Sequence, residues 1–169
     1  MKDFTNDKRY MSLVSDIYYN NEFNKIKKIE HHGVTRFEHS LKVSYYSYKI
    51  SKILKLDYKD VARAGLLHDF FFSDEERNAK DRIVSTFKHP KISVLNSRLY
   101  FNLNSKEIDI IRCHMFPVNL KLPKYAESWI VCFVDKGVAI YEFCKKFITI
   151  FKLKYATNIY LLFLINFFN

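Results

Sequence analysis

Glycine and proline are scarce in this sequence, with only three of each among 169 residues. A sandwich or barrel of many short strands needs frequent tight turns, and these two residue types supply many of them. Their scarcity argues against that architecture and favours helices joined by polar loops. We therefore expect an all-α fold.

Cysteine is also scarce, and its pattern bears on the cellular compartment. The three cysteines, Cys113, Cys132 and Cys144, are odd in number and form no Cys-x-x-Cys pair. Nothing at the N-terminus resembles a signal peptide with a cleavage site. The simplest prediction is a cytoplasmic protein whose cysteines are small core residues.

Basic residues outnumber acidic residues by 28 to 18, which gives a formal net charge of +10. This charge is compatible with nucleic acid, anionic lipid or a phosphorylated small molecule as partner. The lysines are spread along the chain, however, which favours a generally solvated surface over nucleic-acid binding. The length and the 49% apolar content predict one folded domain with one sizeable core.

Hydrophobic periodicity predicts the helices of the first half. Residues 35–56 contain neither glycine nor proline, and apolar residues recur there near helical spacing, which indicates one long amphipathic helix. A second helix is expected after Leu56-Asp57, capped by Asp60 or the preceding Lys-Asp region. It runs into His68-Asp69, so this pair is expected to close a buried helix.

The second half of the chain also favours helices. A new helix is expected after Pro90, because proline suits the first helical turn, whereas residues 73–82 resemble a solvated loop or a short surface helix. Asn104 and Glu107 have the spacing of a capping box at a helix start. A last strong helix is expected over roughly residues 125–146.

The C-terminal residues 155–169 carry no charge and are rich in Leu, Ile and Phe. This stretch is shorter than the roughly 20 residues that span a bilayer. We interpret it as a terminal core helix or a dimer helix. The alternative is an interfacial membrane contact, because Lys152 and Lys154 precede the aromatic, apolar stretch.

Aspartates and histidines beside apolar segments carry the chemical signal. Asp69 lies within AGLLHDFFF and Asp135 within WIVCFVDKGVAI, where an unpaired ionised carboxylate would cost several kcal/mol. A divalent cation would compensate both. The histidines are His31, His32, His39, His68, His89 and His114.

Imidazole and carboxylate together suit Zn, Fe, Mn or Ni better than Ca, which prefers oxygen ligands alone. Such an ion lowers the pKa of bound water and neutralises charge on a phosphoryl oxygen. The ligand types therefore favour hydrolysis of a phosphate ester.

The order of these residues is specific. His39, the His68-Asp69 pair at the end of an apolar helix and Asp135 in a later helix follow the pattern H…HD…D. This pattern resembles the HD superfamily of metal-dependent phosphohydrolases, and the segment ARAGLLHDFF is particularly similar to bacterial members. The similarity covers roughly residues 30–142.

The resemblance implies a single-domain, all-α helical bundle with the metal site in its centre. The HD domain would span residues 30–146, after an N-terminal helical segment over residues 1–29. The apolar tail, residues 147–169, would pack on the domain or on a dimer partner, so a homodimer is one expectation.

The resemblance also implies a ligand set of one or two divalent metal ions, with Fe, Mn, Ni, Co, Zn and Mg as candidates. Asp69 would bridge from the first ion to a second. In the mononuclear alternative, His89 and His114 contact phosphate or satisfy the core. The first-ion ligands would be His39, His68, Asp69 and Asp135, and the second-ion histidines would be His89 and His114.

Arg36 is a candidate for catalysis and for substrate binding. It lies one helical turn before His39, and its guanidinium would reach a substrate phosphate on the same face. The alternative is an exposed salt bridge to Glu38 or Glu30.

Lys136 and His32 are further candidates. Lys136 follows Asp135 directly and would neutralise phosphate charge, although neighbours in a helix face about 100° apart. His32 is either an acid or phosphate contact, or a solvent-exposed loop residue. With Asp69 and Arg36, Lys136 completes the catalytic candidates, and His32 joins Arg36 and Lys136 as a substrate-binding candidate.

The predicted function is hydrolysis of a phosphomonoester or phosphoanhydride, with a nucleotide as the expected substrate, by metal-activated water. The alternative is a degenerate HD domain that binds a nucleotide or a protein partner without chemistry. It is motivated by Phe70, Phe71 and Phe72, which stand where some relatives carry a polar residue after the HD pair. A nucleic-acid phosphodiesterase is a third, less favoured option.

Overall fold

The computed structural model describes residues 4–31, 33–72 and 79–167. Within these ranges the chain is helical apart from one short antiparallel hairpin, in which Glu30 pairs with Thr35 and His31 with Val34. The predicted all-α fold is confirmed. The elements are η1 (Phe4–Asn6), α1 (Lys8–Tyr18), α2 (Asn21–Asn24), η2 (Lys25–Lys28), β1 (Glu30–His31), β2 (Val34–Thr35), α3 (Arg36–Ile53), α4 (Tyr58–Leu67), α5 (Ala79–Tyr100), α6 (Ser105–Cys113) and α7 (Ala126–Phe167).

Side-chain caps mark where α1, α2, α3, α4 and α6 begin. The capping box predicted at Asn104 and Glu107 is present at the start of α6. A second capping box, formed by Thr35 and Glu38, starts α3. Helix α4 is capped by Asp57 and not by Asp60, because the Asp57 carboxylate accepts the Asp60 N–H at 3.4 Å.

Helices α3 and α4 pack closely because the residues between them are small. A Cβ atom added at Gly65 would lie 3.0 Å from the Cα of Ser44, so α4 approaches the α3 backbone at glycine. The Ser44 hydroxyl also donates to the Ala62 carbonyl at 2.6 Å. This contact fixes the end of α4 against α3. The buried serines of α3 are Ser40, Ser44, Ser47 and Ser51.

The N-terminal helices share this core. Tyr10, Val14 and Ile17 of α1 are fully buried in the same apolar cluster as residues of α3 and α4. The Tyr10 hydroxyl lies 2.7 Å from the Ser44 hydroxyl. One apolar core therefore includes residues on both sides of the boundary predicted after residue 29.

Helix α5 differs from the prediction. It begins at Ala79 and passes through Pro90, whereas a new helix was expected after this proline. Proline removes one N–H donor and favours a kink, but the hydrogen bonds on either side can carry the helix past it. Of the predicted loop over residues 73–82, residues 73–78 lie outside the described residues and the rest belongs to α5.

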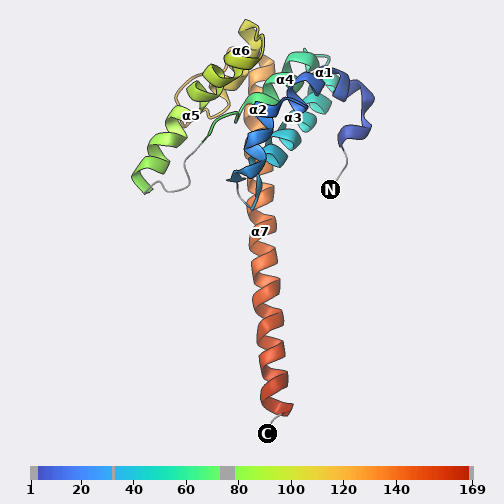
Figure 1. Cartoon of the computed structure of the whole chain (residues 1–169), viewed down its shortest axis with the longest axis vertical. Coiled ribbons are helices and arrows are strands. Elements are labelled where there is room, and N and C mark those ends of the chain that lie inside the picture. Colours follow the sequence, from blue (N-terminus) through green and yellow to red (C-terminus); the bar gives the residue numbers. More distant parts are fainter. Residues whose placement is uncertain (1–3, 32, 73–78, 168–169) are drawn as a thin grey trace.

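Helix α7 is longer than predicted. It continues to Phe167 instead of ending near Lys146, and its C-terminal part extends away from the other helices, which gather around its N-terminal end (Figure 1). Residues 143–151 are exposed, although the Lys146 side chain lies against Gly33 and its ammonium is 3.5 Å from Glu30. Packing of residues 147–169 on their own domain stays a prediction, as does packing on a dimer partner. Among the described residues, no helix combines the length and the hydropathy needed to cross a membrane.

Candidate metal centre

Six side chains from five segments converge in the bundle. The segments are α3, the residues directly after α4, α5, the residue directly after α6, and α7. Their ligand atoms form three overlapping groups, and within each group all atoms lie within 4.8 Å of one another. Every member is buried. The groups are His39, His68 and Asp69; His68, His114 and Asp135; and Asp69, His89 and His114.

The first part of the centre surrounds the Asp135 carboxylate. Its Oδ1 lies 3.0 Å from His39 Nε2 and 3.5 Å from His68 Nε2. The same His68 nitrogen lies 3.8 Å from Asp69 Oδ2. One cation placed among these atoms would meet two imidazole nitrogens and two carboxylates, as the resemblance implies.

The second part of the centre lies on the other oxygen of Asp69. Asp69 Oδ1 is 3.3 Å from His89 Nε2 and 3.5 Å from His114 Nε2, and these two nitrogens are 3.0 Å apart. The Asp69 carboxylate therefore presents one oxygen to each part. This is the arrangement expected of a carboxylate that bridges two ions.

Helix ends orient two of the imidazoles. His68 and His114 each occupy the C-cap position of a helix, where carbonyl oxygens lack partners within the helix. His68 Nδ1 bonds to the Gly65 carbonyl at 2.8 Å, and His114 Nδ1 bonds to the Ile111 carbonyl at 2.7 Å. With Nδ1–H as the donor, each Nε2 is left as the acceptor that a metal ion needs.

Glu142 orients the third imidazole, and the sequence analysis did not identify it. Its Oε2 lies 2.8 Å from His39 Nδ1, and its Oε1 accepts from Lys42 at 2.6 Å. Glu142 is 3% exposed, so this carboxylate depends on both partners. The available signal was its spacing, because a residue seven positions after Asp135 lies two helical turns further along the same face.

The electrostatic surroundings give the histidines of the cluster different pKa values. Burial lowers the pKa of His39, but hydrogen bonds to Asp135 and Glu142 outweigh it and raise this pKa to about 10. Burial and the nearby His68 and His89 lower the pKa of His114 to about 3. Without a metal, His39 is therefore charged and His114 is neutral at neutral pH.

The two aspartates stay ionised despite burial. Burial raises the pKa of Asp69, but the charge of His68 and a hydrogen bond from His89 outweigh it and lower this pKa well below its ordinary value. Hydrogen bonds from His39 and His68 likewise lower the pKa of Asp135 against the effect of burial. Two anionic carboxylates thus face the imidazoles of the centre.

Arg36 is not the exposed salt bridge that one alternative described. It is 5% exposed, and its guanidinium donates to the Phe71 carbonyl at 2.6 Å. The guanidinium carbon lies 3.7 Å from the centroid of the Phe71 ring. That ring stacks on the His89 imidazole at 4.8 Å between centroids. Phe71, which sequence reasoning treated only as a missing polar group, thus links Arg36 to the centre.

Lys136 and His32 are the remaining substrate-binding candidates. The Lys136 ammonium donates to the carbonyl oxygens of His114 at 2.8 Å and Cys132 at 3.2 Å, so it supports the segment that carries His114. Its predicted contact with phosphate stays a prediction. His32 lies outside the described residues.

Two orphaned atoms indicate that this centre fits a cation. His68 Nε2 and Asp69 Oδ1 are buried, and within the described part of the chain neither has a partner in good hydrogen-bond geometry; Asp135 Oδ1 lies 3.5 Å from the nitrogen and His89 Nε2 lies 3.3 Å from the oxygen. An imidazole nitrogen and an anionic oxygen with such poor partners are costly in a core, and a divalent cation satisfies both at once. The donor set of imidazole and carboxylate fits the transition metals that the sequence predicts.

Comparison with known proteins agrees with this geometry. A family model described as HD domain matches residues 36–139, a span that includes all six candidate ligands. No curated protein and no solved structure matches the chain.

The bridging position of Asp69 predicts its effect on metal content. Asp69→Asn should remove most of the bound metal, because one carboxylate serves both parts of the centre. Asp109→Asn is the matched control, since Asp109 is also buried but accepts from Ser128 Oγ at 2.7 Å and belongs to none of the ligand groups. Elemental analysis of the purified proteins measures the metal content. Unchanged metal content in Asp69→Asn would contradict the assignment.

Metal binding is also expected to release a proton from His39. The pKa of His39, raised to about 10 without metal, keeps its imidazole protonated at neutral pH, whereas a ligand nitrogen must be deprotonated. Titration calorimetry in buffers of different ionisation enthalpy should show proton release at pH 7 that declines as the pH approaches 10. Glu142→Gln should reduce the release, because it removes one cause of the raised pKa. Buffer-independent heats at pH 7 would refute this expectation.

Proposed function

We propose that this chain, which belongs to the HD-domain family, is a metal-dependent phosphohydrolase that cleaves a phosphomonoester or phosphoanhydride of a nucleotide. The observation that carries the proposal is the buried cluster of four histidines and two aspartates in three overlapping groups, two of which share Asp69. The family is one of metal-dependent hydrolases, and the cluster has the ligand chemistry that such hydrolysis needs.

When bound, divalent ions would make water nucleophilic near neutral pH and neutralise charge on the phosphoryl group. The chain's own residues position the imidazoles that this chemistry needs. Gly65, Ile111 and Glu142 hold the three Nδ1 atoms, so the Nε2 atoms of His39, His68 and His114 face the carboxylates. Their low mobility within a packed core limits rearrangement during the reaction.

Arg36 is the residue that we assign to the substrate. Burial lowers its pKa, and the Asp69 charge opposes that effect, so the guanidinium and the Asp69 carboxylate interact electrostatically. Stacking on Phe71 restricts the plane of the guanidinium, which lowers the entropy cost of a bidentate contact with a phosphate. Arg36 would hold the non-reacting phosphoryl oxygens.

The alternative proposal is binding without turnover. Phe70 is fully buried and Phe71 is 7% exposed, so apolar rings occupy the positions directly after the HD pair. Neither ring supplies a proton donor or acceptor for a leaving group. A nucleotide held by the metal centre but not hydrolysed is the outcome that this feature favours.

Turnover separates the two proposals. Protein loaded with Mn, Fe, Co or Ni should hydrolyse at least one nucleoside mono-, di- or triphosphate, and the double variant His68→Ala, Asp69→Ala should not. Arg36→Lys should lower kcat/KM roughly ten- to hundredfold, because the planar fork is lost. Arg112→Lys, a matched change at an exposed arginine, should leave kcat/KM unchanged. Tight nucleotide binding without product would support the binding alternative.

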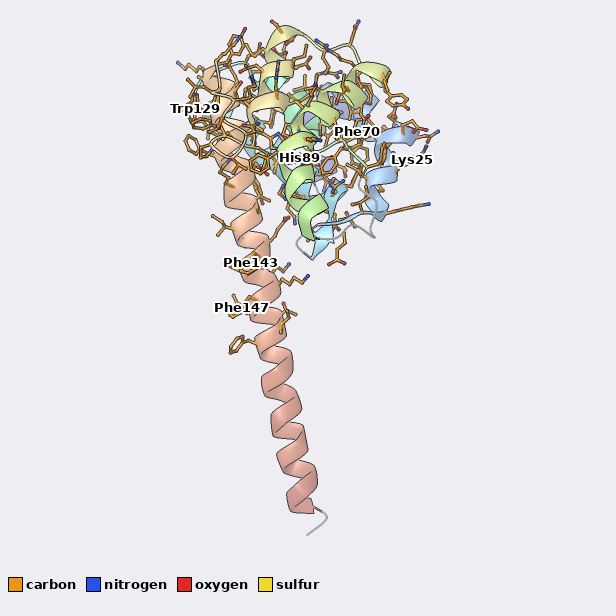
Figure 2. The ribbon with its side chains drawn as sticks, turned by 90° about the vertical axis from the view of Figure 1, so that its left-hand side faces the viewer. Lys25, Phe70, His89, Trp129, Phe143 and Phe147 are labelled. Carbon is orange, nitrogen blue, oxygen red and sulfur yellow. The ribbon has the colours of Figure 1, made fainter. Side chains whose placement is uncertain are left out.

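The exposed part of α7 is the basis for proposing a homodimer. Apolar side chains lie along it at spacings of seven, three, four and three residues, as in the seam of a coiled coil. Figure 2 shows two of them, Phe143 and Phe147, on the part of α7 beyond the bundle. A second copy of the same helix would supply a complementary seam. The exposed seam residues are Phe133, Ile140, Phe143, Phe147 and Ile150, each at least 54% exposed.

Charge in this seam should separate the copies. Phe143→Glu with Phe147→Glu places two like charges at each former contact, so the protein should change from dimer to monomer in sedimentation equilibrium. Lys145→Glu with Thr149→Glu adds charge on α7 outside the seam and should leave the mass unchanged. Wild-type protein that is monomeric at all concentrations would contradict the proposed dimer.

A further inference from the structure

A groove of about 970 Å³ lies between α3 and α7, apart from the metal ligands. Its walls include Val34, Ile50, Val134 and Val138, and none of the six candidate ligands lines it. The groove is therefore a separate cavity that the proposed hydrolase chemistry does not use.

The groove is open and apolar along its length. Tyr46 is 37% exposed, Ile50 39% and Tyr141 61%, although each offers mostly apolar surface. A Cβ atom added at Gly137 would meet nothing within 4 Å, so there is open space on the α7 side of the groove at this point. Clefts of this volume with apolar walls are typical of small-molecule sites.

The charge around the groove is positive. Three lysines and one acid, Glu38, line it, and Glu38 is engaged by the Thr35 N–H in the capping box. Lys42 is already paired with Glu142. Within the described part of the chain, no carboxylate pairs with Lys49 or Lys145. These two ammonium groups remain to meet an anion.

The two lysines lie at opposite ends of the groove. Gly33 lies against the Lys146 side chain while His39 contacts Asp135, so α3 and α7 run antiparallel and Lys145 lies near the start of α3. Thirteen residues of α3 separate Arg36, which follows Val34 closely, from Lys49, roughly 20 Å along the axis. An apolar groove of this length, with a cation at each end, matches a long chain that carries one charged end. The shape suits one extended chain.

We propose that this groove binds a single-chain amphipathic anion, a long-chain fatty carboxylate, with the chain on the apolar walls and the carboxylate at Lys49 or Lys145. A nucleotide is disfavoured, because among the described residues that line the groove the neutral polar side chains are Tyr46 and Tyr141, too few to recognise a base. An acyl chain needs only apolar contact, and its head needs only a cation.

Dodecanoate, below its micellar concentration, is the probe, titrated into the full-length protein by calorimetry. Saturable binding is expected, and each further methylene that the groove buries should tighten it about fourfold, so octanoate should bind far more weakly. Dodecyltrimethylammonium, which has the same chain and the opposite charge, should not bind.

Variants test the location without touching the metal ligands. Gly137→Phe should fill the open wall and abolish binding, and Lys49→Glu or Lys145→Glu should weaken binding at least tenfold at the end that holds the carboxylate. Lys121→Glu, at an exposed lysine outside the groove, is the matched control and should bind normally. Circular dichroism confirms that each variant folds.

Several results of these experiments would contradict the proposed binding. Absence of saturable binding, equal binding of the cationic detergent, or full binding by Gly137→Phe would overturn the proposal. If Gly137→Phe changes the molecular mass in sedimentation while wild-type protein ignores dodecanoate, a second copy covers the groove and the proposal is wrong. The titration needs neither metal nor turnover, so its outcome is independent of the proposed hydrolase activity.

Discussion

The constraint on which the structure depends is the burial of two ionised carboxylates in an apolar helical core. Asp69 and Asp135 are 5% and 8% exposed. Protonated imidazole can compensate them only in part, because several adjacent imidazolium ions would repel one another. Burial, together with the nearby His68 and His89, lowers the pKa of His114 to about 3, so this imidazole stays neutral and adds no positive charge. A divalent cation concentrates more positive charge in less space and lets every imidazole remain neutral.

The helical scaffold makes this concentration feasible because helix ends and small residues meet at one place. The close approach of α4 to α3 at Gly65 brings His68 near His39. The unpaired carbonyls at the ends of α4 and α6 then act as acceptors for the outer nitrogens of His68 and His114. The ends of these helices, where backbone carbonyls lack partners, are therefore the places where ligand imidazoles are oriented. A histidine near the start of a helix, such as His39, has no free carbonyl beside it and needs a side-chain acceptor, which Glu142 supplies.

Local sequence determined which parts of this arrangement could be predicted. The helical class followed from the scarcity of turn residues, and the capping box at Asn104 was readable because its partners are three residues apart. Asp69 and Asp135 were identifiable because their carboxylates stand beside apolar runs, and the resemblance to the HD superfamily implied the full set of six candidate ligands. Their convergence, in contrast, rests on contacts between helices far apart in the chain. Glu142 was missed because its partner, His39, lies 103 residues away, and nothing local marks an exposed-looking glutamate as buried.

The errors at helix boundaries have the same origin. Pro90 was taken as a start because proline suits the first turn, yet the rest of α5 keeps the helix intact across it. The length of α7 was underestimated, although no glycine or proline follows Lys146 to stop the helix. In both cases too little weight was given to the continuity of backbone hydrogen bonds, which favours an uninterrupted helix once it has formed.

Glu142 also explains how two different environments can share the helices α3 and α7. It accepts from His39 on the side of the metal centre and from Lys42, which lines the groove. Because Lys42 is already neutralised at 2.6 Å, its charge is largely unavailable to an anion in the groove, and that anion would have to use the lysines at the ends. The Lys42–Glu142 pair therefore separates the two electrostatic environments. Without it, the partly buried Lys42 would lose its carboxylate partner and the buried Glu142 would keep only His39, which is the costlier state.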